Sequence, residues 1–201
     1  MQATHLFKRR HLLATAWKNG GGVTVELARW PAHASLDEFD WRVSIAKVAS
    51  SGPFSVFPGV DRIITLLEGE GFALRSLDLH SNDGVIDHQL DQPLQPFAFV
   101  GETSIQADLI GGASVDFNVM CTRARCTASV QIITCETQMP ASAYGLLYVH
   151  SGRWLANNQP LATNDGLWWH ARENDTEQTL SLSPRSANAQ LIAVLIDAHS
   201  A

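Results

Sequence analysis

Short apolar segments separated by turn-forming residues run along the whole chain, and this pattern constrains the fold more than any other feature. The segments have the length of strands and lack sustained helical periodicity. The clearest are Phe39–Ala49, Arg62–Leu67, Gly71–Leu77, Phe97–Val100, Ile105–Leu109, Val115–Met120, Ser129–Thr134, Gly145–His150, Arg153–Ala156 and Leu191–Ile196. The best helix candidate, residues 31–39, begins at a proline and predicts a short turn at most. The sequence therefore predicts an all-β fold, a sandwich or a barrel.

Composition excludes several classes of protein. A chain of 201 residues can bury a full core, and its net charge of −6 without a basic block argues against a nucleic-acid partner. No apolar run follows the basic residues near the N-terminus, so we expect neither a signal peptide nor a membrane span. The three cysteines have no metal-ligand spacing, and reduced thiols in the cytoplasm are the simplest account of them.

Two segments share one pattern of strand, glycine turn and strand. Residues 64–74 show it first, and residues 145–155 show it again with a later Pro-Leu pair in each half. Each copy alone is also what an ordinary β-hairpin shows, but this order of elements is typical of a cupin barrel. The repetition predicts a bicupin, two tandem jelly-roll β-barrels. Residues 1–125 would form the barrel with the ligand pocket and residues 126–201 the second, and an exchange of strands between them is left open.

The segment Ala16–Thr24 holds three consecutive glycines after Asn19, flanked by Trp17 and Lys18. Asn-Gly followed by an alternating strand predicts a hairpin turn. A second interpretation is a turn that also presents Trp17 and Lys18 to a ligand. A phosphate-binding loop is excluded because the glycines lead into β-branched residues at period two, and not into a helix.

Polar residues alternate with apolar ones in two strands that otherwise look buried. In residues 41–46, Arg42 and Ser44 share one face, and in residues 116–120, Asp116, Asn118 and Met120 do. A sheet with one face in water explains either strand alone. If the sheet closes on itself, the same faces line an interior pocket.

A carboxylate is the ligand that this pocket would suit. Arg62 follows the Pro58-Gly59 turn, beside Asp61, with which it could form a local ion pair. If Lys18, Arg42 and Arg62 converge, their charges would bind an acid. Phe54 and Phe57 are expected in the core. No His-x-His pair is present, so we expect neither a metal nor another cofactor.

Five blocks of the sequence together resemble the HutD/Ves family. They are Trp17–Thr24, Phe39–Ala46, Gly52–Arg62, Leu66–Gly69 and Asp116–Met120. The resemblance implies a cytoplasmic bacterial bicupin without the usual metal ligands. It points to ligand-binding roles for Trp17, Lys18, Asn19, Glu26, Arg42, Ser44, Arg62, Asp116, Asn118 and Met120. Val25 stands where a basic or polar residue is common in the family, which leaves the choice between the HutD and Ves branches open.

Three functions compete. The family resemblance implies a regulatory binder that moderates histidine utilisation by binding a pathway intermediate, formiminoglutamate or urocanate. A metal-free cupin enzyme acting on a small acid or sugar derivative is the alternative, with Glu26, Asp116 and Lys18 as candidate acids or bases. No nucleophile with an adjacent base is recognisable, which favours the binder. Trp168 and Trp169 are expected in the core of the second barrel, and an interaction or homodimer surface is the other interpretation.

Overall fold

The chain folds almost entirely into β-strands. The computed structural model describes residues 3–36, 38–78, 84–170 and 179–199. Within these ranges the strands are joined by turns and by a single short 3₁₀ helix, η1 (Arg9–His11). None of the helical structure in those ranges is long and apolar enough to cross a membrane. The all-β prediction is confirmed.

The strands form two compact units, Leu13–Arg125 and Met1–Leu12 with Cys126–Ala201. The first twelve residues were expected in the first domain, residues 1–125. In the structure β1 (Ala3–Lys8) pairs antiparallel along its length with β17 (Asp165–His170), so it completes a sheet of the second unit. This pairing joins residues far apart in sequence, which local pattern cannot reveal.

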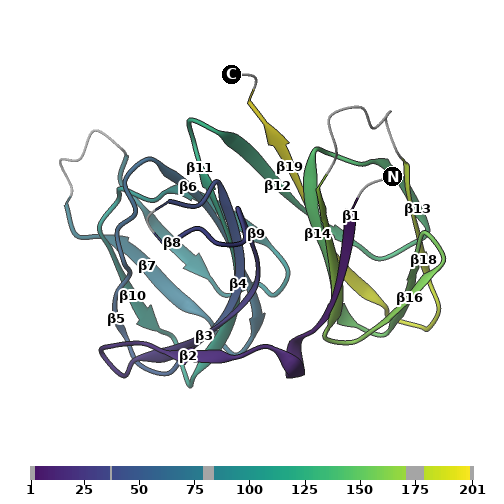
Figure 1. Ribbon diagram of the computed structural model, residues 1–201. Coiled ribbons are helices and arrows are strands. Elements are labelled where there is room, and N and C mark those ends of the chain that lie inside the picture. Colours follow the sequence, from purple (N-terminus) through teal and green to yellow (C-terminus); the bar gives the residue numbers. More distant parts are fainter. Residues whose placement is uncertain (1–2, 37, 79–83, 171–178, 200–201) are drawn as a thin grey trace. The chain divides into compact units, whose positions relative to one another are not determined.

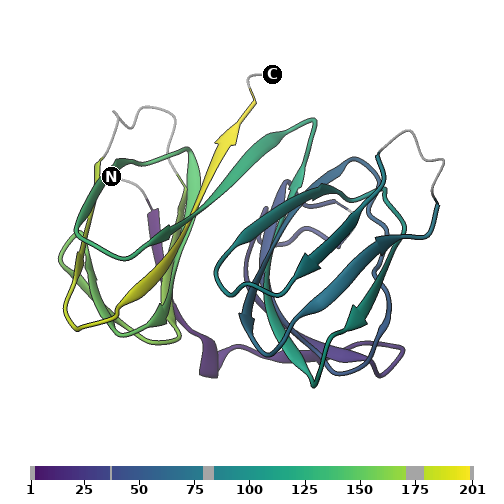
Figure 2. The ribbon, with the colours of Figure 1, turned by 180° about the vertical axis from the view of Figure 1, so that it is seen from behind.

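The unit of residues 13–125 consists of two facing sheets (Figures 1 and 2). The six-stranded sheet is ordered β2 (Ala14–Ala16), β3 (Gly22–Trp30), β4 (Trp41–Val48), β11 (Ser114–Thr122), β6 (Val60–Glu68) and β9 (Pro96–Val100). The four-stranded sheet is ordered β5 (Gly52–Pro53), β10 (Ile105–Leu109), β7 (Phe72–Ser76) and β8 (Asp87–Leu90). Ile64 and Leu66 of the first sheet pack with Phe72 and Leu74 of the second, so the core lies between them.

The second unit also has two sheets. Its five-stranded sheet is ordered β1, β17, β14 (Tyr144–Ser151), β19 (Gln190–Ala198) and β12 (Cys126–Ile133). Its four-stranded sheet is ordered β13 (Thr137–Pro140), β18 (Thr179–Pro184), β15 (Arg153–Ala156) and β16 (Gln159–Ala162). Leu147 and Leu191 of the larger sheet pack with Trp154 and Leu182 of the smaller one.

The two units repeat one topology. The order β4-β11-β6-β9 in one unit matches β12-β19-β14-β17 in the other, and β5-β10-β7-β8 matches β13-β18-β15-β16. The repeated motif of strand, glycine turn and strand is the connection between the two sheets of each unit, β6 to β7 and β14 to β15. Gly71 before β7 and Gly152 before β15 both have positive φ, which a side chain would strain. The motif is therefore a crossover between sheets and not a hairpin.

The barrels that the sequence predicted do not close. Backbone pairing among the described strands gives four open sheets, two in each unit. Apolar side chains bridge the sheets where hydrogen bonds do not, since the core clusters of both units draw residues from both of their sheets. Alternation of polar and apolar residues along a strand can be recognised in the sequence. The packing of side chains between two sheets cannot, so the sequence does not distinguish a sandwich from a barrel.

Trp168 and Trp169 lie on opposite faces of β17. Trp169 is buried in the apolar core of the second unit, and its indole Nε1 donates to the carbonyl oxygen of Ser142 at 3.1 Å. Trp168 is only partly buried and stacks on His5, with ring centroids 4.0 Å apart. Only one of the two tryptophans is therefore in the core where both were expected.

We expect Trp169→Ala to lower the free energy of unfolding by about 3–5 kcal/mol, because it empties a core position. Trp168→Ala should cost about 1 kcal/mol, mainly the lost stacking on His5. Chemical denaturation of the two variants beside the wild type measures both values. Equal losses for the two variants would contradict the placement of Trp168 outside the core.

Candidate functional site

Strand register places two arginines on either side of one methionine. Met120 of β11 is the direct partner of Arg42 on β4 and of Arg62 on β6. Directly opposed residues of antiparallel strands point to the same face. The polar face predicted for β4 and the polar face predicted for β11 are therefore one continuous surface, and Arg62 joins it.

This surface faces the interior of the unit. Asn118 opposes Ser44 and Ile64, and Asp116 opposes Leu66. Because Ile64 and Leu66 belong to the core between the two sheets, the polar residues beside them also point inward. The interpretation of a sheet with its polar face in water does not apply to β4 and β11.

Glu26, Arg29 and Arg42 form the more open side of the cluster. Arg42 Nε donates to Glu26 Oε2 at 2.8 Å, and its Nη1 lies 3.8 Å from the sulfur of Met120. The other oxygen of Glu26 lies 3.3 Å from Arg29 Nε, so one carboxylate faces two guanidinium groups. The Glu26 side chain is 33% exposed and that of Arg42 is 13% exposed. Arg29 was not expected at the site, because strict alternation from Glu26 puts it on the outer face, whereas a β-bulge between Glu26 and Ala28 returns it to the inner face.

Arg62 is buried and surrounded by aromatic rings. Its guanidinium carbon lies 4.9 Å from the ring centroid of Phe99, 5.5 Å from Phe54 and 5.7 Å from Phe57. Its Nη1 donates to the carbonyl oxygen of Ser55 at 3.4 Å, and its Nε has no partner among the described residues. Burial lowers the pKa of Arg62 to about 10, with Asp116 raising it and Arg42 lowering it further. The group therefore stays charged at neutral pH.

Asp116 and Asn118 are buried acceptors beside these arginines. Asp116 is 2% exposed and Asn118 is 9% exposed. The Oδ1 atoms of both residues have no hydrogen-bond partner in the described part of the chain. Burial raises the pKa of Asp116 to about 7, against the opposing effect of Arg62. Buried polar atoms are normally paired, so an unpaired group of them indicates a bound molecule or water.

The glycine-rich segment forms the hairpin turn. Gly20 has φ +72°, Asn19 Oδ1 accepts the backbone N–H of Gly21 at 3.0 Å, and both Lys18 and Asn19 are exposed. Trp17 turns inward, where Nε1 donates to Thr24 Oγ1 at 2.8 Å and the ring packs against the core. The structure thus brings Arg42 and Arg62 together but leaves Lys18 exposed on the turn.

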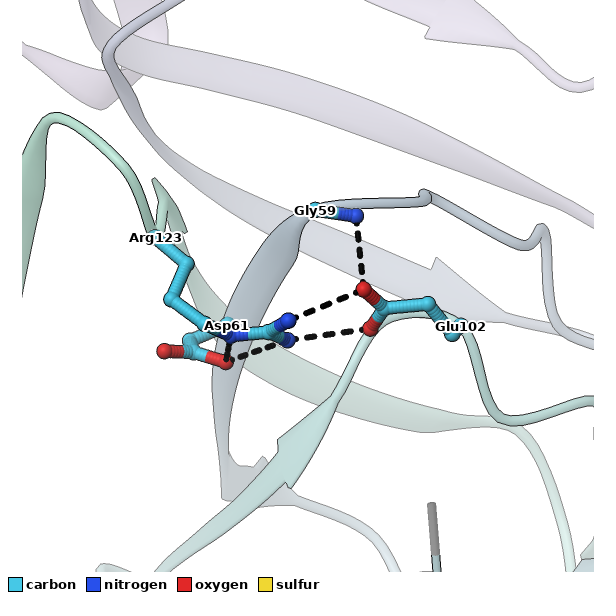
Figure 3. Close-up of polar contacts among 4 residues, drawn as sticks. All are labelled: Gly59, Asp61, Glu102 and Arg123. Atoms are coloured by element: carbon cyan, nitrogen blue, oxygen red, sulfur yellow. Dashed lines mark hydrogen bonds and ion pairs between the residues drawn. The ribbon is translucent and has the colours of Figure 1, made fainter. Parts of the chain in front are cut away.

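Asp61 pairs with Arg123 and not with Arg62, so the expected local pair does not form. The Arg123 side chain also binds Glu102 at 3.0 Å, and Glu102 accepts the backbone N–H of Gly59 at 2.7 Å (Figure 3). The Arg123 guanidinium and the Gly59 amide lower the pKa of Glu102 to about 2. The network holds the Pro58-Gly59 turn, which lies directly after Phe57, in place. In this turn Gly59 has φ +75°, as a type II turn requires.

Within the described residues, no group of three or more His, Cys, Asp or Glu side chains is placed to hold a metal ion. The donors gathered on the inner face are guanidinium, amide and carboxyl groups, with a thioether from Met120. Such a set suits hydrogen bonding to an organic acid more than it suits metal ligation.

The second unit provides an internal comparison. Its strand β19 corresponds in topology to β11 and its β14 to β6. On the inner face of β19 stand Leu191, Ala193 and Leu195, where β11 has Asp116, Asn118 and Met120. The same arrangement of strands therefore forms with an apolar interior, and the charged residues of β11, β4 and β6 are not a requirement of the topology.

Comparison with known proteins identifies similar chains. A family model described as HutD matches residues 9–189. Protein Ves of Escherichia fergusonii is 38% identical over 177 residues, which cover 88% of this chain and 86% of that protein. The structure of HutD from Pseudomonas fluorescens SBW25 is 27% identical with a TM-score of 0.82, covering 98% of this chain and 100% of that one. A cupin 2 conserved barrel domain protein from Leptotrichia buccalis, 7% identical, has a TM-score of 0.53 over 96% of both chains and shares the fold alone.

Replacing Asp116 by Asn should stabilise the protein more at high pH than at low pH. The raised pKa means that the folded state holds a proton that the unfolded state has released, so the wild type loses stability as pH rises from about 4 to about 7. The free energy of unfolding of Asp116→Asn relative to wild type should rise by about 2–3 kcal/mol between pH 5 and pH 8. Urea unfolding at both pH values tests this, with Asp87→Asn, 81% exposed, as control. A difference independent of pH would contradict the buried state of Asp116.

Replacing Glu102 by Gln should lower the free energy of unfolding only at pH values at which the wild-type carboxylate is charged. Because its folded pKa is depressed to about 2, its contribution is present above about pH 4.5 and is lost as pH falls towards 2. The loss at pH 7 should be about 1 kcal/mol or less, since the network is on the surface. Thermal unfolding at pH 7 and pH 2.5 measures it, and Glu70→Gln, at an exposed position, is the control. An equal deficit at both pH values would mean that the amide harms the fold by another route.

Proposed function

Because the chain belongs to the HutD/Ves family, we propose that it binds a small carboxylate without a metal, at the inner face of its six-stranded sheet. The proposal includes a regulatory role, in which the protein moderates histidine utilisation by binding a pathway intermediate. Formiminoglutamate is the leading candidate and urocanate the second. The two units are proposed to be the two cupin-type barrels of a bicupin, each opened into a pair of facing sheets.

One observation carries this proposal. Arg62, Asp116 and Asn118 are buried together, and each keeps a polar atom without a partner among the described residues. Burying such groups is costly unless they are hydrogen-bonded. The equivalent face of the second unit is apolar, so the fold does not require these polar residues. A bound polar molecule supplies the missing hydrogen-bond partners and accounts for the burial of these polar residues.

The balance of charge favours an acid. Three guanidinium groups, those of Arg29, Arg42 and Arg62, lie on a surface that also holds the carboxyl groups of Glu26 and Asp116. Since the pKa of Asp116 is raised to about 7, that group is partly neutral at physiological pH. The surface therefore carries a net positive charge when empty. Guanidinium groups bind carboxylates through paired hydrogen bonds, and they bind them strongly where water is excluded.

A metal-free enzyme acting on a small acid or sugar derivative is the second candidate, and the raised pKa of Asp116 is the observation that favours it. A carboxyl group that titrates near neutral pH can take up and release a proton during a reaction. Lys18, the other basic candidate, is exposed on the hairpin turn and does not join Asp116 on the inner face by any contact that we observe. Proton NMR of each acid incubated with the protein would reveal a product; an unchanged spectrum supports the binder.

Titration calorimetry with formiminoglutamate and urocanate tests the binding proposal. We expect one of them to bind the wild type, and Arg42→Ala to weaken that binding at least tenfold, because a charged hydrogen-bond donor is lost from a largely buried position. Glu26 keeps Arg29 as a partner in this variant, so the melting temperature should change little.

Lys18→Ala is the matched control, since it also removes one positive charge but from the exposed turn. It should change the affinity less than twofold. The proposal fails if neither acid binds the wild type at millimolar concentration. If an acid binds and Arg42→Ala binds it equally well, the inner face of β4 is not the site.

A further inference from the structure

Residues 54–57 form a covering segment over the guanidinium group of Arg62. The rings of Phe54 and Phe57 lie 5.5 and 5.7 Å from its central carbon, and the carbonyl oxygen of Ser55 accepts a hydrogen bond from its Nη1 at 3.4 Å. Ring faces attract a cation without fixing its direction, and a hydrogen bond of this length is weak. The orientation of the long arginine side chain therefore depends on how firmly the covering segment itself is held.

Backbone hydrogen bonds attach the covering segment at its two ends. The N–H of Phe54 donates to the carbonyl oxygen of Ile105 at 2.9 Å, and the N–H of Phe57 donates to that of Gly101 at 2.8 Å. Val56, between these ends, is 45% exposed, so the middle of the segment lies at the surface. The attachment at the Phe57 end decides where its ring meets the guanidinium.

A surface network holds the turn that follows Phe57 (Figure 3). The Arg123 guanidinium binds both oxygens of Glu102 at 3.0 Å and one oxygen of Asp61 at 2.7 Å. The backbone N–H of Arg123 donates to the carbonyl oxygen of Gly59 at 2.8 Å, and Glu102 accepts the N–H of Gly59 at 2.7 Å. One arginine therefore joins the turn, the strand that follows it and the loop after β9.

We propose that Arg123 is a positioning residue, which holds the Phe57 ring against Arg62 by fixing the turn between them. The inference rests on the proposed function, in which Arg62 is one of the groups that bind the ligand. A pair of parallel hydrogen bonds between a guanidinium and a carboxylate fixes direction as well as distance, which suits this role. The network is on the surface and adds little stability, so its main effect is on geometry.

The titration of Asp116 reports where the Arg62 guanidinium lies. Burial raises the pKa of Asp116 to about 7 and the charge of Arg62 lowers it, so this pKa rises further if the guanidinium moves away. The other titratable and charged groups of the inner face and of the facing sheet's edge are not altered in the variants below; they are Glu26, Arg29, Arg42 and His88. A change in the pKa of Asp116 therefore reflects a movement of Arg62.

Carbon NMR titration of the Asp116 carboxyl group, in ligand-free wild type and Arg123→Gln, tests the inference. We expect the variant to raise the pKa of Asp116 by about 0.5, because the guanidinium is no longer held in place. Arg125→Gln is the matched control, since it removes the same charge from the same turn but breaks a pair with Asp40. Equal pKa values of Asp116 in the two variants would overturn the inference.

Phe57→Leu separates the positioning role from a general loss of stability. If Arg123 acts through this ring, Phe57→Leu alone raises the pKa of Asp116, and adding Arg123→Gln to it causes no further rise. No rise in Phe57→Leu, or an additive rise in the double variant, would overturn the inference. The comparison of Arg123→Gln with Arg125→Gln stands even if Phe57→Leu does not fold.

Calorimetry with formiminoglutamate distinguishes this inference from the proposed function. Binding should be weaker by about threefold in Arg123→Gln than in Arg125→Gln, because a less ordered Arg62 must be fixed when the acid binds. Equal affinities would overturn the inference and leave the proposed function standing. If neither formiminoglutamate nor urocanate binds the wild type, the proposed function fails, and the titration of ligand-free protein still decides whether Arg123 positions Arg62.

Discussion

A guanidinium group buried inside a β-sandwich loses its hydration, and the surroundings of Arg62 offset part of that cost in free energy. Three phenyl rings face it, the carbonyl of Ser55 accepts one of its hydrogen bonds, and Asp116 on the neighbouring strand offsets part of its charge. The carboxyl of Asp116 is itself buried, so its proton is held to a higher pH than usual. The two groups do not compensate each other fully. The polar atoms that remain unpaired are available to form hydrogen bonds with a ligand.

The inner surface of the six-stranded sheet could be predicted in part from the sequence. Alternation in residues 41–46 and 116–120 predicts which side chains share a face, because a strand fixes this locally. The all-β class follows in the same way from segment length and turn residues. Two interpretations of the glycine-rich segment were open, and the hairpin turn is confirmed for Lys18 and Asn19. Trp17 turns towards the core, where it meets Thr24.

The remainder depends on contacts between distant residues. That β11 lies between β4 and β6, and so aligns Arg42, Met120 and Arg62, is a matter of register that no local pattern contains. The β-bulge that brings Arg29 to Glu26, and the pairing of β1 with β17, are likewise long-range. Asp61 stands next to Arg62 in sequence but points to the other face, where it meets Arg123. The side chains of two consecutive residues in a strand point to opposite faces, so they do not meet.

The repeated topology separates the residues that the fold requires from those that the site requires, since one unit has an apolar interior and the other a charged one. Mapping of backbone amide chemical shifts during titration with formiminoglutamate tests this separation most directly. We expect the shifted amides to cluster in β3, β4, β6 and β11, around Arg42, Arg62 and Asn118. Shifts concentrated in β14 and β19 of the second unit, or a spectrum unchanged at millimolar acid, would contradict the assignment of ligand binding to the charged interior.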